Sequence, residues 1–419
     1  MRITFMLLTT LLLCAISPAK AQMSFSDSAL TYLKENAKDF QKNRGYLVDD
    51  DIAANNQIFF IQENHAIKEN YAVELALIEE LKAKTDFTYY LAEMDLGEAA
   101  ELNEYLKTGN EVILQKNCSD KKGTFAWMKE EFTFYQALYS LNQKYDKKIQ
   151  LLGVDIAISK DFGLGYLKDL LKESPNTKTI IDSIDSASNS GTADFNFVRR
   201  IKPSIELLLQ ADKTLDTFTI RYHLNNILNY EKASNSQNWD ATRDSLIFEN
   251  YQMLVNHFGI QKEVMVGVWG RDHGLQKDHS NTKWFASSLK QNLKLSIYTY
   301  NIFYLDCQQR FPRVFLPSFL KPFYSWGKTY NRIGFCNDDN ALSVIKPGIK
   351  LLKKASISHT ITFFRLDKPL SPLTKTVGLD HKYIPFVADA PSGCKLVTTD
   401  FFQTAILIRN SEAATPLMQ

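Results

Sequence analysis

The 419-residue sequence lacks several patterns that would identify its class directly. After its first residues it has no apolar run long enough to span a bilayer, so we expect no stable membrane insertion. Its cysteines form no C-x-x-C pair, which argues against a structural zinc site. Gly-rich phosphate loops are missing as well, which counts against a nucleotide enzyme.

The sequence also lacks the features of a nucleophilic hydrolase and of a nucleic-acid-binding protein. It contains no G-x-S-x-G elbow, which disfavours a catalytic serine triad. Its 49 Lys and Arg residues nearly balance its 47 Asp and Glu residues. We therefore expect no nucleic-acid partner and no attraction to an acidic membrane, and a small-molecule substrate remains the simplest partner.

The first 21 residues have the pattern of a secretory signal peptide. Arg2 precedes an apolar run from Phe5 to Ile16, and Ala19-Lys20-Ala21 is a small-x-small cleavage site. We predict cleavage after Ala21 and a periplasmic or secreted protein. Cys14 follows a leucine, where a lipoprotein signal would have a small residue, so release is favoured over lipid anchoring.

Four cysteines remain after cleavage, at positions 118, 307, 336 and 394. An oxidising compartment allows one or two disulfides among them. Cys307 and Cys336 are the pair we expect on proximity in the sequence, although the sequence leaves the pairing open.

The most informative stretch runs from Asn56 to Glu69. Residues Ile58 to Ile61 predict a short buried strand, which stops on Glu63 and His65 and turns directly into a helix. A carboxylate and an imidazole are thus expected at the carboxyl end of a strand, where open α/β sheets bind their ligands.

Further strands alternate with helices along the chain. They are predicted at Tyr89–Met94, Ile149–Val154, Glu263–Val268, Leu295–Tyr300, Ile361–Leu366 and Thr404–Ile408. Residues 160–240 read as helical and polar. The expected fold is α/β, a mostly parallel central sheet flanked by helices, with a helical insertion after the third strand. Residues 22–419 are taken as one such domain.

Two helices carry side chains of interest. A helix from Asp240 to about His257 would place Arg243 and Asn250 on an otherwise apolar face, where buried polar groups need partners. A helix before the third strand is expected to carry an aromatic seam that serves packing first and a ligand second. The seam consists of Phe125, Met128, Phe132, Tyr135 and Tyr139.

Four predicted strands end on polar side chains. Because carboxyl ends of parallel strands share one edge of a sheet, these side chains should converge. The strand ends carry Glu63 and His65, then Glu93 and Asp95, then Asp155, then Arg271, Asp272 and His273.

Such a cluster supports two chemistries. His65 could act as general base on a water, its tautomer fixed by Glu63 or Glu93, while Arg243, Arg271 or His273 stabilises the oxyanion. Alternatively, a divalent metal could lower the pKa of a bound water to about 7. Its ligands would be Glu63, His65, Glu93 and His273.

The order of these motifs resembles the erythromycin esterase-like family over residues 56–304. The resemblance rests on strand-Glu63-x-His65-helix, strand-Glu93-x-Asp95, Gly153-Val-Asp155, the helix pairs Arg243-Asp244 and Glu249-Asn250, and the turn at Gly270 to His273. Residues 400–408 are similar to the family's closing strand. The Gln62-Glu-Asn-His65 spacing is closer to the related haem-binding ChaN-like and metal-dependent TIKI/TraB-like proteins, and Glu74 stands where the family has a basic residue.

The strand-end cluster and the resemblance together predict that His65 activates water for hydrolysis of an ester-like bond, with Glu63, Glu93, His273 and Arg243 as further catalytic residues. Asp95, Asn250, Arg271 and Asp155 would bind substrate, and no cofactor is required. The alternatives are a metal-dependent hydrolase or peptidase at the same site, or a degenerate site that binds haem or another small ligand.

Overall fold

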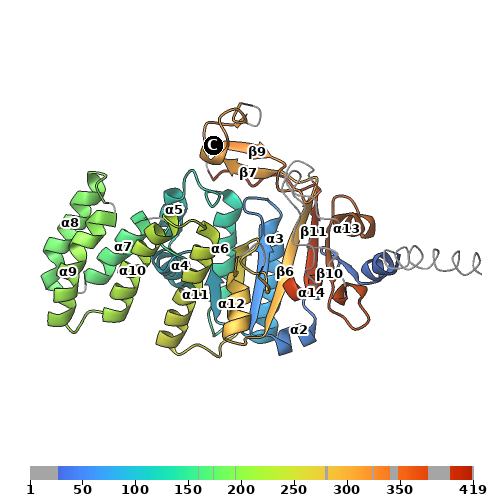
Figure 1. The fold of residues 1–419 in the computed structure, drawn as a ribbon, viewed down its shortest axis with the longest axis horizontal. Helices are drawn as coiled ribbons and strands as arrows, with labels where there is room; N and C mark the ends of the chain where they lie inside the picture. The colour runs from blue at the N-terminus through green and yellow to red at the C-terminus, as the bar shows by residue number, and fades with distance from the viewer. Residues whose placement is uncertain are drawn as a thin grey trace, which may run out of the picture.

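The computed structural model describes residues 27–158, 160–172, 174–193, 195–278, 282–322, 325–339, 348–375 and 397–417. Its centre is an eight-stranded sheet in the order β1-β10-β11-β6-β2-β5-β3-β4 (Figure 1). The strands are β1 (Ala37–Asp39), β2 (Ile58–Glu63), β3 (Tyr89–Ala92), β4 (Gln150–Gly153), β5 (Met265–Gly270), β6 (Ile297–Leu305), β10 (Ile361–Arg365) and β11 (Thr404–Arg409).

Six of these strands, from β11 through β4 in the sheet order, run parallel. The parallel strands are buried on both faces, which explains why they read as continuous apolar runs rather than alternating ones. Only β1 and β10 are antiparallel to their neighbours. The predicted α/β class with a mostly parallel sheet is therefore confirmed.

Helices cover both faces of the sheet. The core on one face joins the sheet to α3 (Asn70–Thr85), α4 (Leu96–Thr108) and α6 (Lys129–Asn142). The core on the other face is formed with α11 (Trp239–Phe258) and α12 (Phe285–Asn292). The remaining labelled helices outside the insertion are α2 (Asp50–Asn55), α5 (Glu111–Asp120), α13 (Ile349–Ala355) and α14 (Thr398–Phe401).

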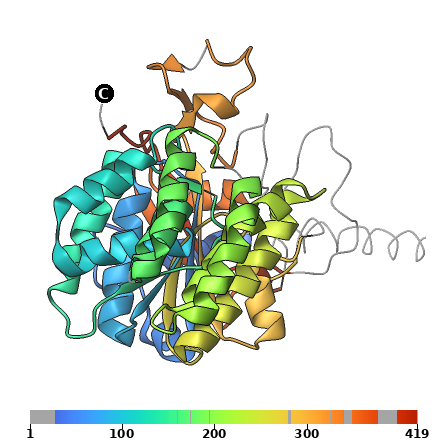
Figure 2. The same cartoon turned by 90° about the vertical axis from the view of Figure 1, so that its left-hand side faces the viewer.

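The helical insertion expected after the third predicted strand is confirmed. Between β4 and α11 the chain forms α7 (Lys160–Leu171), α8 (Lys178–Asn189), α9 (Phe195–Ala211) and α10 (Thr217–Ser234). These helices share a hydrophobic core of their own, including Leu167, Ile205 and Leu224. They lie beyond the β4 edge of the sheet, on the left of Figure 1 and nearest the viewer in Figure 2.

The C-terminal part contains a small antiparallel sheet that the sequence did not predict. It consists of β7 (Gln309–Pro312), β9 (Tyr330–Ile333) and β8 (Ser325–Trp326), and it stands above the main sheet in Figure 1. At the other end of the chain, the described residues begin with a short helix. Residues 27–35 are helical, and residues 37–39 form β1 because they pair with β10.

The cysteine pairing expected from the sequence is not formed. Cys307 and Cys336 are buried free thiols. The sulfur of Cys336 faces the carbonyl oxygen of Cys307, whereas the sulfur of Cys307 points to the carbonyl oxygens of Leu305 and Ile408. Cys394 and the predicted signal peptide lie outside the described residues. No helix within the described ranges combines the length and apolarity needed to cross a membrane.

Candidate functional site

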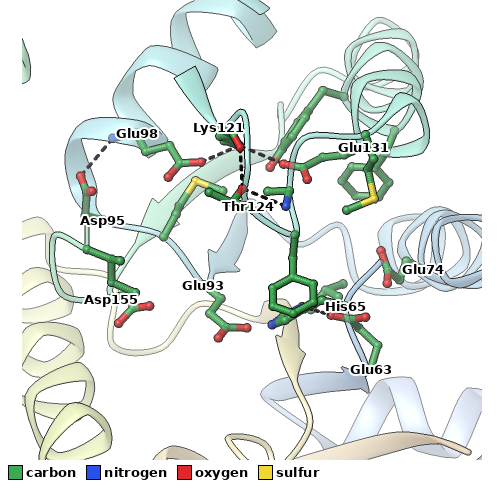
Figure 3. Close-up of a pocket in the computed structure, with 18 of the residues that line it drawn as sticks. Glu63, His65, Glu74, Glu93, Asp95, Glu98, Lys121, Thr124, Glu131 and Asp155 are labelled. Carbon is green, nitrogen blue, oxygen red and sulfur yellow. Dashed lines mark hydrogen bonds and ion pairs between the residues drawn. The ribbon is translucent and has the colours of Figure 1, made fainter. Parts of the chain in front are cut away.

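A cavity of about 660 Å³ opens beyond the carboxyl ends of β2, β3, β4 and β5 (Figure 3). Polar side chains from the strand ends form its floor. The rest of the wall comes from α3, α4, residues 120–128, α6 and α11, and Phe315 also lines it. The strand-end and α11 residues in the wall are Glu63, His65, Glu93, Asp95, Asp155 and Arg243.

His65 is oriented by Glu63 at the end of β2. Nδ1 of His65 is hydrogen-bonded to Oε1 of Glu63, and Oε2 of Glu63 accepts a hydrogen bond of 2.6 Å from Asn70. The hydroxyl of Tyr304 donates to the side-chain oxygen of Asn70 at 2.9 Å. Nε2 of His65 makes no hydrogen bond within the described part of the chain, and 42% of the side-chain surface remains exposed. The imidazole therefore offers one free nitrogen to the cavity.

The charge of Glu63 controls the protonation of His65. Burial lowers the pKa of His65, but the adjacent carboxylate outweighs it and raises the pKa to about 10. The pair consequently holds a proton at neutral pH and becomes a strong base only when that proton leaves.

Glu93 faces His65 across the last residue of β5. A Cβ atom at position 270 would lie 3.0 Å from Nε2 of His65 and 3.3 Å from Oε2 of Glu93. The backbone N–H of Gly270 donates to Oε2 of Glu93 at 2.5 Å. A side chain at this position would therefore press on the imidazole and on Glu93 and occupy the space between them.

Arg243 links the carboxyl ends of β3 and β4 through Glu93 and Asp155. Its NH2 group donates to Glu93 at 2.9 Å and also to Asp155, while its Nε donates to Asp155 at 3.1 Å. Asp155 is almost completely buried, and Arg243 and Glu93 are each 13% exposed. This network brings together residues 88 and 150 positions apart in the sequence.

The network should make the stability of the protein sensitive to acid. Burial raises the pKa of Glu93, but the charges of His273, Arg243 and His65 outweigh it and lower the pKa to about 2. Because its pKa is lowered, ionised Glu93 stabilises the fold at pH values above its ordinary pKa of 4.5. This stabilisation is lost as the pH falls toward 2. We expect Glu93→Gln to remove a pH-dependent stabilisation of up to about 3 kcal/mol, measured by urea unfolding at several pH values. An equal acid dependence in both proteins would contradict this.

His273 stands behind Arg243 and does not form part of the cavity wall. Its Nδ1 lies 2.6 Å from Asp244, whose other oxygen accepts the backbone N–H of Phe285 at 2.6 Å. Its Nε2 lies 3.2 Å from NH1 of Arg243 and 3.5 Å from Glu93. His273 is 7% exposed, so it can influence a ligand only through Arg243 and Glu93.

Asp95 lies in the wall but is occupied as a helix cap. Its carboxylate accepts the backbone N–H groups of Gly97 at 2.7 Å and Glu98 at 3.1 Å, at the start of α4. Burial, followed by the charge of Glu98, raises the pKa of Asp95 to about 7.

Two residues predicted to bind substrate lie elsewhere. Arg271 forms an ion pair of 2.7 Å with Asp338 and donates to the carbonyl of Ile302, outside the cavity. Asn250 is fully buried and donates to the carbonyl of Val154 and to Asn226, so it ties α11 to the end of β4.

The cavity contains two polar residues that the sequence analysis did not assign to the site. Lys121 is buried between Glu98 at 2.6 Å and Glu131 at 2.9 Å. Glu74 projects from α3 into the same space as His65 and Glu63 (Figure 3). Its helical spacing from Tyr71 was the available signal, since residues three apart share a face.

The four residues considered as metal ligands have other partners. Glu63 and His65 bond to each other, Glu93 binds Arg243, and His273 binds Asp244. Among the described residues, no group of three or more His, Cys, Asp and Glu side chains is arranged to hold a metal ion.

Comparison with solved structures finds the same fold in three proteins. A protein from Bacillus cereus superposes with a TM-score of 0.64 at 13% identity, covering 94% of this chain and 99% of the other. A succinoglycan biosynthesis protein gives 0.62 at 14%, with 94% and 99% covered. A mutant of the erythromycin esterase EreC in its open conformation gives 0.55 at 14%, with 91% and 96% covered.

The sequence matches no family model and no curated protein. At these identities, the structural likeness defines the fold that the chain shares with an erythromycin esterase, and it does not extend to activity.

Proposed function

We propose that the protein is an exported hydrolase, similar to the erythromycin esterases, that cleaves an ester-like bond of a small molecule with a water activated by His65. The observation that carries this proposal is the free Nε2 of His65, which faces a cavity of about 660 Å³ while Glu63 fixes the opposite nitrogen. That is the geometry of a histidine base held by a carboxylate. The fold shared with EreC supports it, and export rests on the N-terminal sequence pattern.

Each polar residue of the floor has a role in the proposed reaction. His65 takes the proton of the water, and Glu63 stabilises the imidazolium that forms. Arg243 adds positive charge to the far wall, where Glu93 and Asp155 hold it in place. Charges held in position before the reaction lower the energy of the developing oxyanion without reorganisation.

The direct test is turnover of a panel of lactones and carboxylic esters by the purified protein, with and without a metal chelator. His257→Ala serves as the matched control, because His257 is exposed on α11 away from the cavity. We expect the wild type and the control to hydrolyse the same esters at equal rates, chelated or not. Turnover that disappears with the metal would instead favour a metal-dependent hydrolase.

The pair of Glu63 and His65 predicts a distinct pH dependence. Below its pKa of about 10, the unprotonated fraction of His65 rises about tenfold per pH unit, and kcat/KM should rise with it. Glu63→Gln removes the charge that raises this pKa, so the rising limb should move to lower pH. The measurement is kcat/KM of both proteins between about pH 6 and pH 10. Identical rising limbs in the two pH profiles would show that a group other than His65 controls kcat/KM.

One observation favours a second candidate, a binding protein without catalysis. Because Glu63 raises the pKa of His65, the imidazole is protonated at neutral pH, and a protonated imidazole binds an acceptor but cannot act as a base. This candidate predicts binding of a ligand that carries an acceptor group, for example haem through its propionates, seen as a shift of the Soret band, together with no hydrolysis of any ester. Turnover without haem binding would exclude it.

A further inference from the structure

Glu74 is exceptional among the acidic side chains of the cavity. It lies on the inner face of α3 and is 4% exposed, yet its carboxyl group forms no hydrogen bond or ion pair within the described residues. Every other carboxylate of the wall has a partner in the structure. They are Glu63 with Asn70, Glu93 and Asp155 with Arg243, Asp95 with the start of α4, Glu98 and Glu131 with Lys121, and Asp120 with Lys116.

Burial without a hydrogen-bond partner favours the neutral form of a carboxyl group. Burial raises the pKa of Glu74 well above its ordinary value, and the nearby charges of Glu63 and Glu131 raise it further, while His65 opposes them. The raised pKa favours the neutral form, in which Glu74 is a carboxylic acid with one O–H donor. Figure 3 shows it on the same side of the cavity as His65.

Three other donors of the wall already have partners. Lys121 is held by two glutamates. Arg243 directs three of its nitrogens to Asp155, Glu93 and His273, and the hydroxyl of Tyr71 donates to the sulfur of Met128 at 3.1 Å. A carbonyl group bound beside His65 would thus meet Glu74 as an uncommitted donor.

We propose that Glu74 is a catalytic residue that, as a neutral carboxylic acid, donates a hydrogen bond to the carbonyl oxygen of the scissile ester. This inference rests on the proposed hydrolase function. His65 takes a proton from water, the water oxygen bonds to the carbonyl carbon, and the carbonyl electron pair moves onto the oxygen that Glu74 binds. The intermediate then expels the alcohol oxygen, which takes the proton from His65, and leaves a carboxylic acid product.

The test compares Glu74→Gln with Glu74→Ala. The amide of Gln keeps a neutral N–H donor, so we expect kcat/KM within about tenfold of the wild type, whereas Ala should lose about 100-fold to 1,000-fold. Glu79→Gln, elsewhere on α3 and outside the cavity wall, is the control and should match the wild type. A Gln variant as inactive as Ala, or an Ala variant as active as the wild type, would overturn the inference.

A second measurement does not depend on turnover. The infrared difference between wild type and Glu74→Gln at neutral pH should contain the band of a protonated carboxyl group. If that band is absent, Glu74 is ionised and the inference fails even in an active enzyme. If the band is present but the wild type hydrolyses no ester, the proposed function fails first, and the catalytic role of Glu74 fails with it.

Discussion

Replacing His65 with Ala should lower kcat by about 100-fold to 10,000-fold, which is the usual contribution of a general base. The reason is that Nε2 of His65 is the imidazole nitrogen that faces the cavity, since His273 lies behind Arg243. The melting temperature should fall only modestly: the raised pKa of His65 means that its pair with Glu63 stabilises the fold at neutral pH, but the imidazole is 42% exposed and Glu63 keeps its bond to Asn70. Initial rates on the best ester of the panel and thermal unfolding measure the two effects.

The same measurements on His257→Ala separate loss of the base from general damage. Equal turnover by His65→Ala and the wild type would refute His65 as the base. A large fall in melting temperature would show that the pair with Glu63 is mainly structural.

Arg243→Ala should destabilise the fold by about 3–5 kcal/mol, because it leaves two carboxylates buried without their counter-charge. Asp155 is 1% exposed, and both of its carboxylate oxygens accept hydrogen bonds from Arg243. Glu93 would keep only the N–H of Gly270 and the neighbourhood of the two histidines. The free energy of unfolding from urea titration measures the effect.

Arg221→Ala is the matched control for Arg243→Ala. Arg221 pairs with Glu206 at 2.8 Å, but both side chains are substantially exposed, so its loss should cost less than about 1 kcal/mol. If the two variants lose the same stability, the buried network is not the stabilising element inferred from its geometry.

The sequence predicted the central sheet because its strands are buried on both faces. Each such strand appears as a short apolar run between polar residues, as at Ile58–Ile61. The predicted ends of the strands were less accurate. The strand predicted to end at Tyr300 continues as β6 to Leu305, because the five residues after Tyr300 are buried as well. The small sheet of β7, β8 and β9 was missed because strands of two to four residues leave almost no periodic pattern.

For the site, position at a strand end predicted convergence but not the direction of each side chain. Arg271 and His273 are two residues apart, yet one binds Asp338 outside the cavity and the other supports Arg243. The backbone between them turns at Asp272, with a φ of 91° that few non-glycine residues adopt. Asp95 shows a second ambiguity, because a capping residue and a catalytic carboxylate occur at the same kind of junction.

Glu74 and the aromatic seam show where helical pattern alone is insufficient. Glu74 is buried although a charged residue on a helix usually faces solvent, and only the cavity explains it. Phe125 and Met128 precede α6 instead of belonging to it, and they line the cavity with Tyr135. The seam is therefore partly a ligand-facing surface.

The position of β5 in the sheet governs when the protein can fold during synthesis. β5 lies between β2 and β3, although about 170 residues separate it from β3 along the chain. A nascent chain that has emerged only through the insertion helices has a gap at the middle of its sheet, with the edges of β2 and β3 unpaired. We expect such chains to fold slowly and to depend on chaperones, since exposed strand edges promote aggregation.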